Sequence, residues 1–206
     1  MTDYQKPTRD TETLILQAAE NEFLRKGYSG AKTTSIAEAA GVTHAMLHYY
    51  FRTKDKLYEK ILTIKFGDIS KIMLGALGDI NLPLKERIRQ GIEYHFDFLR
   101  ANPDLPRFLA NELAEHPERI NPVLDDFVPK ARMMLSYLQG ELDRLPGERI
   151  DAGMLLSDIL SINVFPFMAA PILNKMIATY YGTFDEYLDM RKKENVRTIM
   201  HKLKLD

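Results

Sequence analysis

The chain has 206 residues and a formal net charge of −1, and it contains no cysteine. This length is enough for one or two domains with buried cores, and the absence of cysteine excludes disulfides and thiolate metal sites. The near-zero net charge excludes a protein that coats nucleic acid non-specifically through a strongly basic surface.

The first predicted helix covers residues 10–26. Acidic residues stand at its start and Arg25 and Lys26 at its end, which matches the helix dipole. Gly27 is expected to end it. Its apolar residues recur at helical spacing: Leu14, Ile15, Ala18, Ala19 and Phe23.

Residues 33–57 predict two short helices around a tight turn, followed by the start of a third helix. Ala37 is small enough for a close helix crossing, and Gly41 suits the left-handed position after a helix. Thr43 is a good N-cap for the second short helix, and Leu47 would face inward. This pattern is typical of a helix-turn-helix, which places one helix in the major groove of DNA.

The same segment resembles the tetracycline-repressor (TetR) family of bacterial transcription regulators over roughly the first third of the chain. The matching residues are Gly27-Tyr28, Ile36-Ala37-Glu38-Ala39-Ala40-Gly41-Val42-Thr43, Leu47, Tyr50-Phe51 and Thr53-Lys54-Asp55-Lys56-Leu57. The family often has Ser or Thr where Lys32 stands, so Thr33 or Thr34 would cap the second helix instead. It usually has Tyr where His48 stands. The resemblance implies a homodimer with a variable, ligand-sensing C-terminal domain.

Beyond residue 60 the sequence pattern stays helical, and prolines punctuate the expected helix ends. Helices are predicted at 54–77, 84–101, 104–115, 122–145, 152–169 and 184–204, with a shorter one at 171–181. Pro122 and Pro129 are expected to start or kink one helix. The expected fold is all-α, with a helix-turn-helix domain (1–56) joined through a long helix to an effector-binding and dimerisation domain (57–206).

The helix from Met154 to Met168 is apolar on nearly all sides, so it should be buried on nearly all sides. It can meet that demand by facing its own core and a partner subunit, although an ordinary monomer core is the alternative. In the resembled family the last two long helices form a four-helix dimer bundle. The expected interface residues are Ile162, Leu188 and Ile199.

The middle helices are rich in methionine and aromatic residues, which suit an adaptable apolar pocket, although plain core packing is the better explanation for any single one of them. The expected lining residues are Phe96, Phe108, Met133, Met134, Tyr137 and Phe165. Glu112 and Asp158 are the candidate polar groups that would orient an effector.

The helix from Thr43 to Phe51 is the predicted DNA-reading helix, and residues 27–56 carry four basic against two acidic residues. Candidates for base contacts are His44, Ala45, Met46 and Tyr49, and candidates for backbone contacts are Thr33, Thr34, Tyr50 and Lys54. His48 could serve either role, and Thr43, the N-cap of the helix, is also a candidate for DNA contact.

Two other classes of protein remain open. His44 and His48 are four residues apart and could hold a metal in an enzyme, but no Glu sits between them as in the metalloprotease motif. A helical interaction scaffold is the second alternative. No cofactor-binding fingerprint is visible, and neither a catalytic residue nor a cofactor is expected.

The favoured interpretation is a cytoplasmic regulator that binds double-stranded DNA at a palindromic operator. A small, mainly apolar effector would release it, and repression is the usual outcome in the resembled family. Cytoplasmic location follows from the polar N-terminus and from the most apolar stretch, 154–170, which is too short and too polar for a membrane span.

Overall fold

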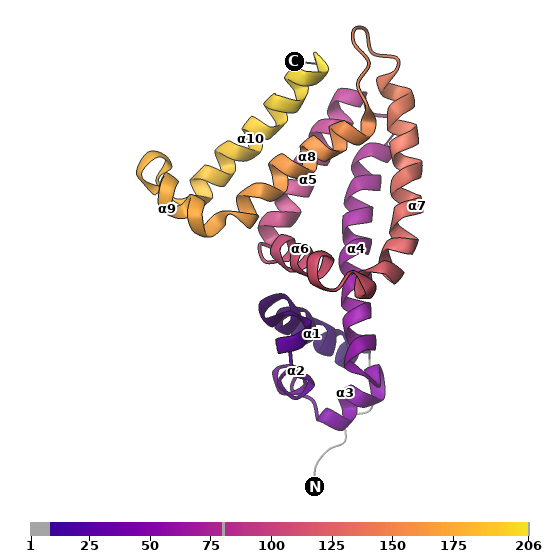
Figure 1. Ribbon diagram of the computed structural model, residues 1–206, viewed down its shortest axis with the longest axis vertical. Coiled ribbons are helices and arrows are strands. Elements are labelled where there is room, and N and C mark those ends of the chain that lie inside the picture. Colours follow the sequence, from indigo (N-terminus) through magenta and orange to yellow (C-terminus); the bar gives the residue numbers. More distant parts are fainter. Residues whose placement is uncertain (1–8, 80, 206) are drawn as a thin grey trace. The chain divides into compact units, whose positions relative to one another are not determined.

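The computed structural model describes residues 9–79 and 81–205, and this part of the chain contains helices and no strand (Figure 1). The all-α prediction is therefore confirmed. The helices are α1 (Arg9–Gly30), α2 (Thr33–Ala39), α3 (His44–Phe51), α4 (Lys54–Gly78), α5 (Leu84–Ala101), α6 (Leu105–Glu115), α7 (Pro117–Leu142), α8 (Ala152–Met168), α9 (Ala170–Tyr181) and α10 (Phe184–Leu203).

The turn chemistry around α3 is the one that the sequence predicts. The Thr43 side chain accepts a hydrogen bond of 3.1 Å from the Met46 amide, so it caps α3. The Thr53 hydroxyl accepts from the Lys56 amide at 3.2 Å at the start of α4. Gly41 has a φ of 67°, which glycine adopts at little cost. Gly27, also at φ 67°, breaks the helical backbone of α1 at the expected place.

The cap of α2 differs from the expectation. The N-cap residue is Lys32, which makes no side-chain cap hydrogen bond, and Thr33 already belongs to the helix. The expectation that Thr33 or Thr34 caps α2 is wrong. Glu22 of α1 supplies the missing acceptor for one backbone group, because its Oε1 accepts from the Lys32 amide at 3.4 Å.

The start of α7 also differs. The helix begins at Pro117 rather than at 122, because proline is well tolerated at the first helical position, where its missing N–H needs no partner. The helix then continues through Pro122 and Pro129, so neither residue starts it. Apolar burial on both sides of Pro122, at Ile120 and Val123, holds this stretch helical.

The helices pack as two compact units. Of the described residues, the first unit contains those up to 66 together with 108–123, and the second contains those of 67–107 and those from 124 onward. The expected domain boundary at residues 56–57 falls inside α4. The first unit buries Ile15, Phe23, Ile36, Leu47 and Leu57.

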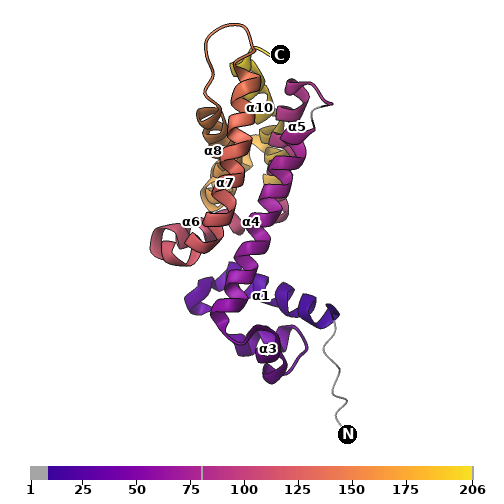
Figure 2. The ribbon, with the colours of Figure 1, turned by 90° about the vertical axis from the view of Figure 1, so that its right-hand side faces the viewer.

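In the second unit α5 packs against α8 and α10, and α8 also packs against α10 (Figures 1 and 2). One core cluster contains Ile88, Ile92, Leu138, Leu142, Ala152, Leu155, Ile199, Met200 and Leu203. A smaller cluster contains Phe96, Leu99, Phe167 and Leu188.

Within the described ranges, no single helix has both the length and the apolarity of a membrane span. The bent pair of α8 and the first part of α9, with 75° between them, passes that test only when the two are taken together.

Candidate functional site

One side of helix α3 is buried and holds the helix in place, and the other side presents a mixed polar and aromatic surface. Leu47 and Phe51 are buried, whereas His44, Ala45 and His48 are exposed. A further exposed residue is Tyr49, at 69%. Met46 and Tyr50 are half-buried at the edge of this surface. An amphipathic helix of this kind leaves one face free for a partner.

Hydrogen bonds orient the two histidines of α3. His44 Nε2 lies 3.0 Å from Thr33 Oγ1, so α2 holds this ring. His48 Nδ1 lies 2.9 Å from the Arg52 carbonyl oxygen, and because a carbonyl only accepts, Nδ1 must donate. The Arg52 backbone, at φ 29°, is in the positive region that non-glycine residues rarely adopt.

The two histidine rings lie next to each other on α3. The His44 and His48 rings meet edge to face at 4.4 Å, and one nitrogen of each ring is already engaged. In the part of the chain that the structure describes, no three histidine or acidic side chains are grouped so that they could share a metal ion.

Tyr28 is the centre of a charged cluster in the first unit. Its hydroxyl donates to Asp55 Oδ1 at 2.5 Å, and Lys54 Nζ lies 4.4 Å from the ring centroid. The Arg119 guanidinium lies 4.0 Å from the same ring. Hydrogen bonding to the Asp55 carboxylate, followed by burial, raises the pKa of Tyr28. Burial and the nearby Arg119 lower the pKa of Lys54.

Two residues expected in an effector pocket belong instead to the neighbourhood of Tyr58 in the first unit. Phe108 meets the Tyr58 ring edge to face at 5.9 Å. Glu112 is buried, and its Oε2 lies 3.8 Å from Arg119 Nη1. Burial and the neighbouring Glu112 carboxylate raise the pKa of Tyr58. This placement gives Phe108 and Glu112 a structural role next to the Tyr28 cluster.

The second unit contains an apolar cavity of about 40 Å³. Its described lining residues are Leu77, Ile88, Gly91, Ile92, His95, Leu138, Leu155, Leu156, Ile159 and Leu160. Among them His95 is the only polar side chain, and none is charged. Ligand sites are commonly apolar hollows with a few placed polar groups, so this cavity is the candidate effector site.

None of the eight residues expected to line an effector pocket lines this cavity. Phe96 and Met134 are buried elsewhere in the second unit, and Met133 and Phe165 are exposed. The Tyr137 hydroxyl accepts a hydrogen bond from Arg87 at 3.0 Å, and Asp158 pairs with Lys202. The cavity is lined by aliphatic residues, so a search for methionine and aromatic residues misses it. A lone histidine in the apolar stripe of α5 is the signal that could have found it.

The expected interface residues also lie differently. Leu188 and Ile199 are buried in the core of their own chain, and Ile162 is half-buried against that core. The exposed large apolar residues of α8 and α9 are instead Met154, Phe165, Met168, Ile172, Met176, Tyr180 and Tyr181. Helix α8 is therefore not buried all round within one chain.

A chain of neutral hydrogen bonds joins α5, α8 and α10 beside the cavity. Pro166 lacks an N–H, so the Ile162 carbonyl loses its helical partner, and Asn195 Nδ2 donates to it at 3.0 Å. Asn195 Nδ2 also donates to Asn163 Oδ1 at 2.8 Å. Asn163 Nδ2 in turn lies 3.2 Å from His95 Nδ1. Asn163 and Asn195 are almost completely buried.

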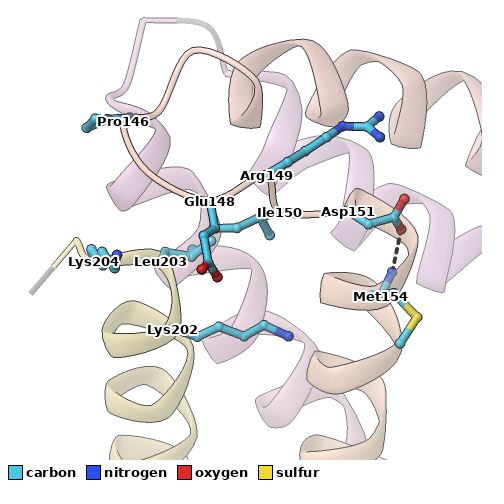
Figure 3. Close-up of a pocket in the computed structure, with 9 residues that line it drawn as sticks. All are labelled: Pro146, Glu148, Arg149, Ile150, Asp151, Met154, Lys202, Leu203 and Lys204. Carbon is cyan, nitrogen blue, oxygen red and sulfur yellow. Dashed lines mark hydrogen bonds between the residues drawn. The ribbon is translucent and has the colours of Figure 1, made fainter.

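A second hollow lies at the surface beside the loop before α8 (Figure 3). Its volume is about 370 Å³, and Arg149, Lys202 and Lys204 line it together with Glu148 and Asp151. Asp151 caps α8 by accepting from the Met154 amide at 2.9 Å, and Lys202 pairs with Asp158. Because Asp151 and Lys202 already have partners within the chain, the surface hollow is the weaker candidate.

The comparisons with known proteins agree with this description. Residues 15–61 match the family described as bacterial regulatory proteins, tetR family. The chain is 27% identical over 188 residues to an uncharacterized HTH-type transcriptional regulator, YdgC of Bacillus subtilis, covering 86% of this chain and 94% of that one. It is 37% identical over 91 residues to the HTH-type transcriptional regulator RutR of Escherichia coli, covering 43% of this chain and 42% of RutR.

The fold has solved counterparts. The crystal structure of the transcriptional regulator FadR from Bacillus subtilis in complex with stearoyl-CoA superimposes with a TM-score of 0.67. The match covers 91% of this chain and 97% of that one at 17% sequence identity, so it supports the fold alone.

Proposed function

Because the chain belongs to the tetR family of DNA-binding transcription regulators, which are not enzymes, we propose that it is a homodimeric repressor of a palindromic operator. A small, mainly apolar effector releases it from DNA. The observation that carries the proposal is the anchored α3 helix, whose outer face is free while Leu47 and Phe51 are buried.

The proposed base contacts come from His44, Ala45, Met46 and Tyr49, which share the outer side of α3. Ala45 and Met46 suit the methyl groups of thymine in the major groove. His48 adds an acceptor, because its Nδ1–H is used by Arg52 and the neutral ring then has a lone pair on Nε2. An acceptor at this place suits the amino group of adenine or cytosine.

The proposed backbone contacts come from Thr33, Thr34, Tyr50 and Lys54, which flank α3, and these groups set the register of the helix on DNA. The amides at the start of α2 favour a phosphate, because the α2 N-cap has no side-chain hydrogen bond. Lys54 is half-buried over Tyr28, so its contact with phosphate would be made from a fixed position.

The proposed dimer uses the exposed apolar residues of α8 and α9. Contiguous exposed apolar surface on one chain is typical of a protein–protein interface, and reading a palindrome needs two copies of α3. Phe165, on α8, is 58% exposed in the single chain, so its large apolar ring is available to a partner subunit.

The proposed effector site is the apolar cavity of the second unit. At about 40 Å³ it holds only a few atoms, so a larger ligand must displace the aliphatic side chains of α5 and α8. A ligand that needs a rearranged cavity binds one conformation better than the other, which is the condition for a shift in DNA affinity.

Selection from a random DNA library tests the reading of DNA. The expected result is an enriched palindrome bound with strong salt dependence, and no enrichment would reject the regulator in favour of an interaction scaffold. Lys54→Ala should then weaken binding to all DNA sequences alike, and should lower by about one the slope of log affinity against log salt concentration. His44→Ala should instead reduce the preference for one base pair over the others at particular operator positions, by about 1–3 kcal/mol. Lys60→Ala, on the exposed side of α4, is the control.

Sedimentation tests the dimer. Phe165→Glu would place an unpaired carboxylate in the interface and should weaken dimerisation by at least about 100-fold while the chain stays folded. Tyr94→Glu, at a residue 50% exposed on α5, is the matched control and should stay dimeric. A Phe165→Glu dimer of normal strength would place the interface elsewhere.

A further inference from the structure

The hydrogen bonds beside the cavity fix the orientation of the Asn163 amide. Its Nδ2 donates to the Ile92 carbonyl oxygen at 3.0 Å, and its Oδ1 accepts from Asn195 at 2.8 Å. A flipped amide would place its oxygen against the Ile92 carbonyl and its nitrogen against the Asn195 amino group. Both contacts would then be lost, so the flipped orientation is excluded.

This orientation fixes the tautomer of His95. Asn163 Nδ2 is a donor, so the His95 Nδ1 atom 3.2 Å away must accept. The neutral ring therefore carries its proton on Nε2. Burial lowers the pKa of His95 to about 4, which keeps the ring neutral at physiological pH.

His95 consequently keeps one donor, Nε2–H, that no described residue uses. The residue is 93% buried and lines the apolar cavity, and its Nδ1 accepts from Asn163. No described lining residue carries a charge that could neutralise an anionic ligand. A carboxylate or phosphate would thus lose its strong hydration for a single neutral hydrogen bond, whereas the same bond replaces most of the weaker hydration of a neutral acceptor.

We propose that the cavity binds a small neutral molecule, mainly aliphatic, with one hydrogen-bond acceptor such as a ketone or ester carbonyl, and that His95 Nε2–H donates to this acceptor. This inference rests on the proposed effector site and names the chemistry of its ligand. It also identifies His95 as the residue that distinguishes a polar ligand from an alkane of the same shape.

Binding of matched probes tests this chemistry. The probes are 2-hexanone, 2-methyl-1-hexene, which replaces C=O by C=CH₂ at the same shape, and hexanoate. The full chain should bind the ketone at least as tightly as the alkene, although the alkene is the more hydrophobic molecule, and should bind hexanoate most weakly. In His95→Phe the ratio of the two dissociation constants should shift about fivefold in favour of the alkene, as expected for one neutral hydrogen bond. His116→Phe, outside the cavity, is the control and should leave the ratio unchanged.

A second measurement on the unaltered chain covers the case in which His95→Phe does not fold. In ¹⁵N-histidine NMR spectra the His95 ring should be protonated on Nε2, and only the ketone should shift that proton. A ring protonated on Nδ1, a ketone that does not bind saturably, or tightest binding of hexanoate would each overturn the proposal.

Two outcomes distinguish a failure of this inference from a failure of the proposed function. If the selected operator is released by a molecule that leaves the His95 resonances unchanged, the ligand chemistry is wrong and the regulator stands. If the ketone binds through His95 but no operator is enriched, the ligand chemistry stands and the regulator does not.

Discussion

The polar contacts around Tyr28 in the first unit join charged side chains, whereas those around Asn163 in the second unit join neutral groups. Asp55 is exposed and Lys54 is half-buried, so water still solvates these charges. Asn163 is 0% exposed and Asn195 1%. Moving an ion into such a place costs several kcal/mol, and an amide with its partners avoids most of that cost. The two clusters thus differ in both burial and chemistry, and they should respond differently to mutation, acid and salt.

The largest effect is expected from breaking the neutral network. Asn163→Leu keeps the number and branching of the side-chain heavy atoms but leaves His95 Nδ1 without its donor and Asn195 with one acceptor fewer. Unsatisfied buried groups cost about 1–3 kcal/mol each, so the free energy of unfolding should fall by about 2–5 kcal/mol. Urea denaturation measures the free energy of unfolding. The control is Asn174→Leu, at an exposed position of α9, which should change this free energy by less than about 0.5 kcal/mol. Equal losses in both variants would show that the network contributes little.

Acid should break the same network without mutation. The pKa of His95 falls from 6.5 to about 4 on folding, so the unfolded chain binds a proton more readily. The stabilisation by neutral His95 is therefore complete above pH 6.5 and is lost as the pH falls toward 4. The loss is about 3 kcal/mol in total. His95→Gln cannot be protonated and should flatten this part of the pH profile, measured by denaturation. If stability depends on pH in the same way in His95→Gln, groups other than His95 cause the acid sensitivity.

The charged cluster should be weaker and sensitive to salt. Arg119→Gln removes the cation next to the Tyr28 ring and Glu112, and the expected loss is about 1 kcal/mol at low ionic strength. This loss should shrink in 1 M salt, because screening weakens partly exposed charges. The loss from Asn163→Leu should be the same at both salt concentrations. A salt-independent Arg119→Gln effect would remove the contrast between the two units.

The smallest effect is expected from adding a methyl group to Gly91, which lines the cavity in the second unit. A methyl group added at Gly91 would lie 3.6 Å from Ala76 Cβ and 3.9 Å from Leu77 Cδ2, which are ordinary contacts. Gly91→Ala should therefore stabilise α5 by about 0.5–1 kcal/mol through its better helix propensity. It should also weaken 2-hexanone binding, because Gly91 lines the cavity. Gly140→Ala, where a methyl group meets nothing within 4 Å, should stabilise without changing binding. Unchanged ketone affinity in Gly91→Ala would place the ketone outside this cavity.

The helix ends could be predicted from the sequence because each depends on one or two local residues. Thr43, Thr53 and Gly41 act on backbone groups a few positions away, so their roles can be recognised without the fold. The α2 cap could not be predicted, because its backbone partner, Glu22, comes from another helix. Pro117 and Pro122 both resemble helix starts, and burial of their neighbours decides between them.

The cavity could not be predicted for a related reason. Leu156, Ile159 and Leu160 look like any other core residues until the packing of α5 against α8 shows which of them face a hollow. The partner of the Ile162 carbonyl likewise comes from α10, more than thirty positions away. Local patterns reveal which residues are inside, but the packing of helices decides which of those residues can meet a ligand.

The length of α3 also sets how much sequence information the chain can read. Eight residues, His44–Phe51, span about 12 Å along the helix axis, which corresponds to about three or four base pairs. Two copies would read about seven base pairs, or one sequence in about 16,000, whereas a genome offers about a million or more competing sites. Base contacts alone would thus leave tens of equal matches. The remaining discrimination must come from the shape and stiffness of the DNA between the half-sites, at positions that the protein does not touch.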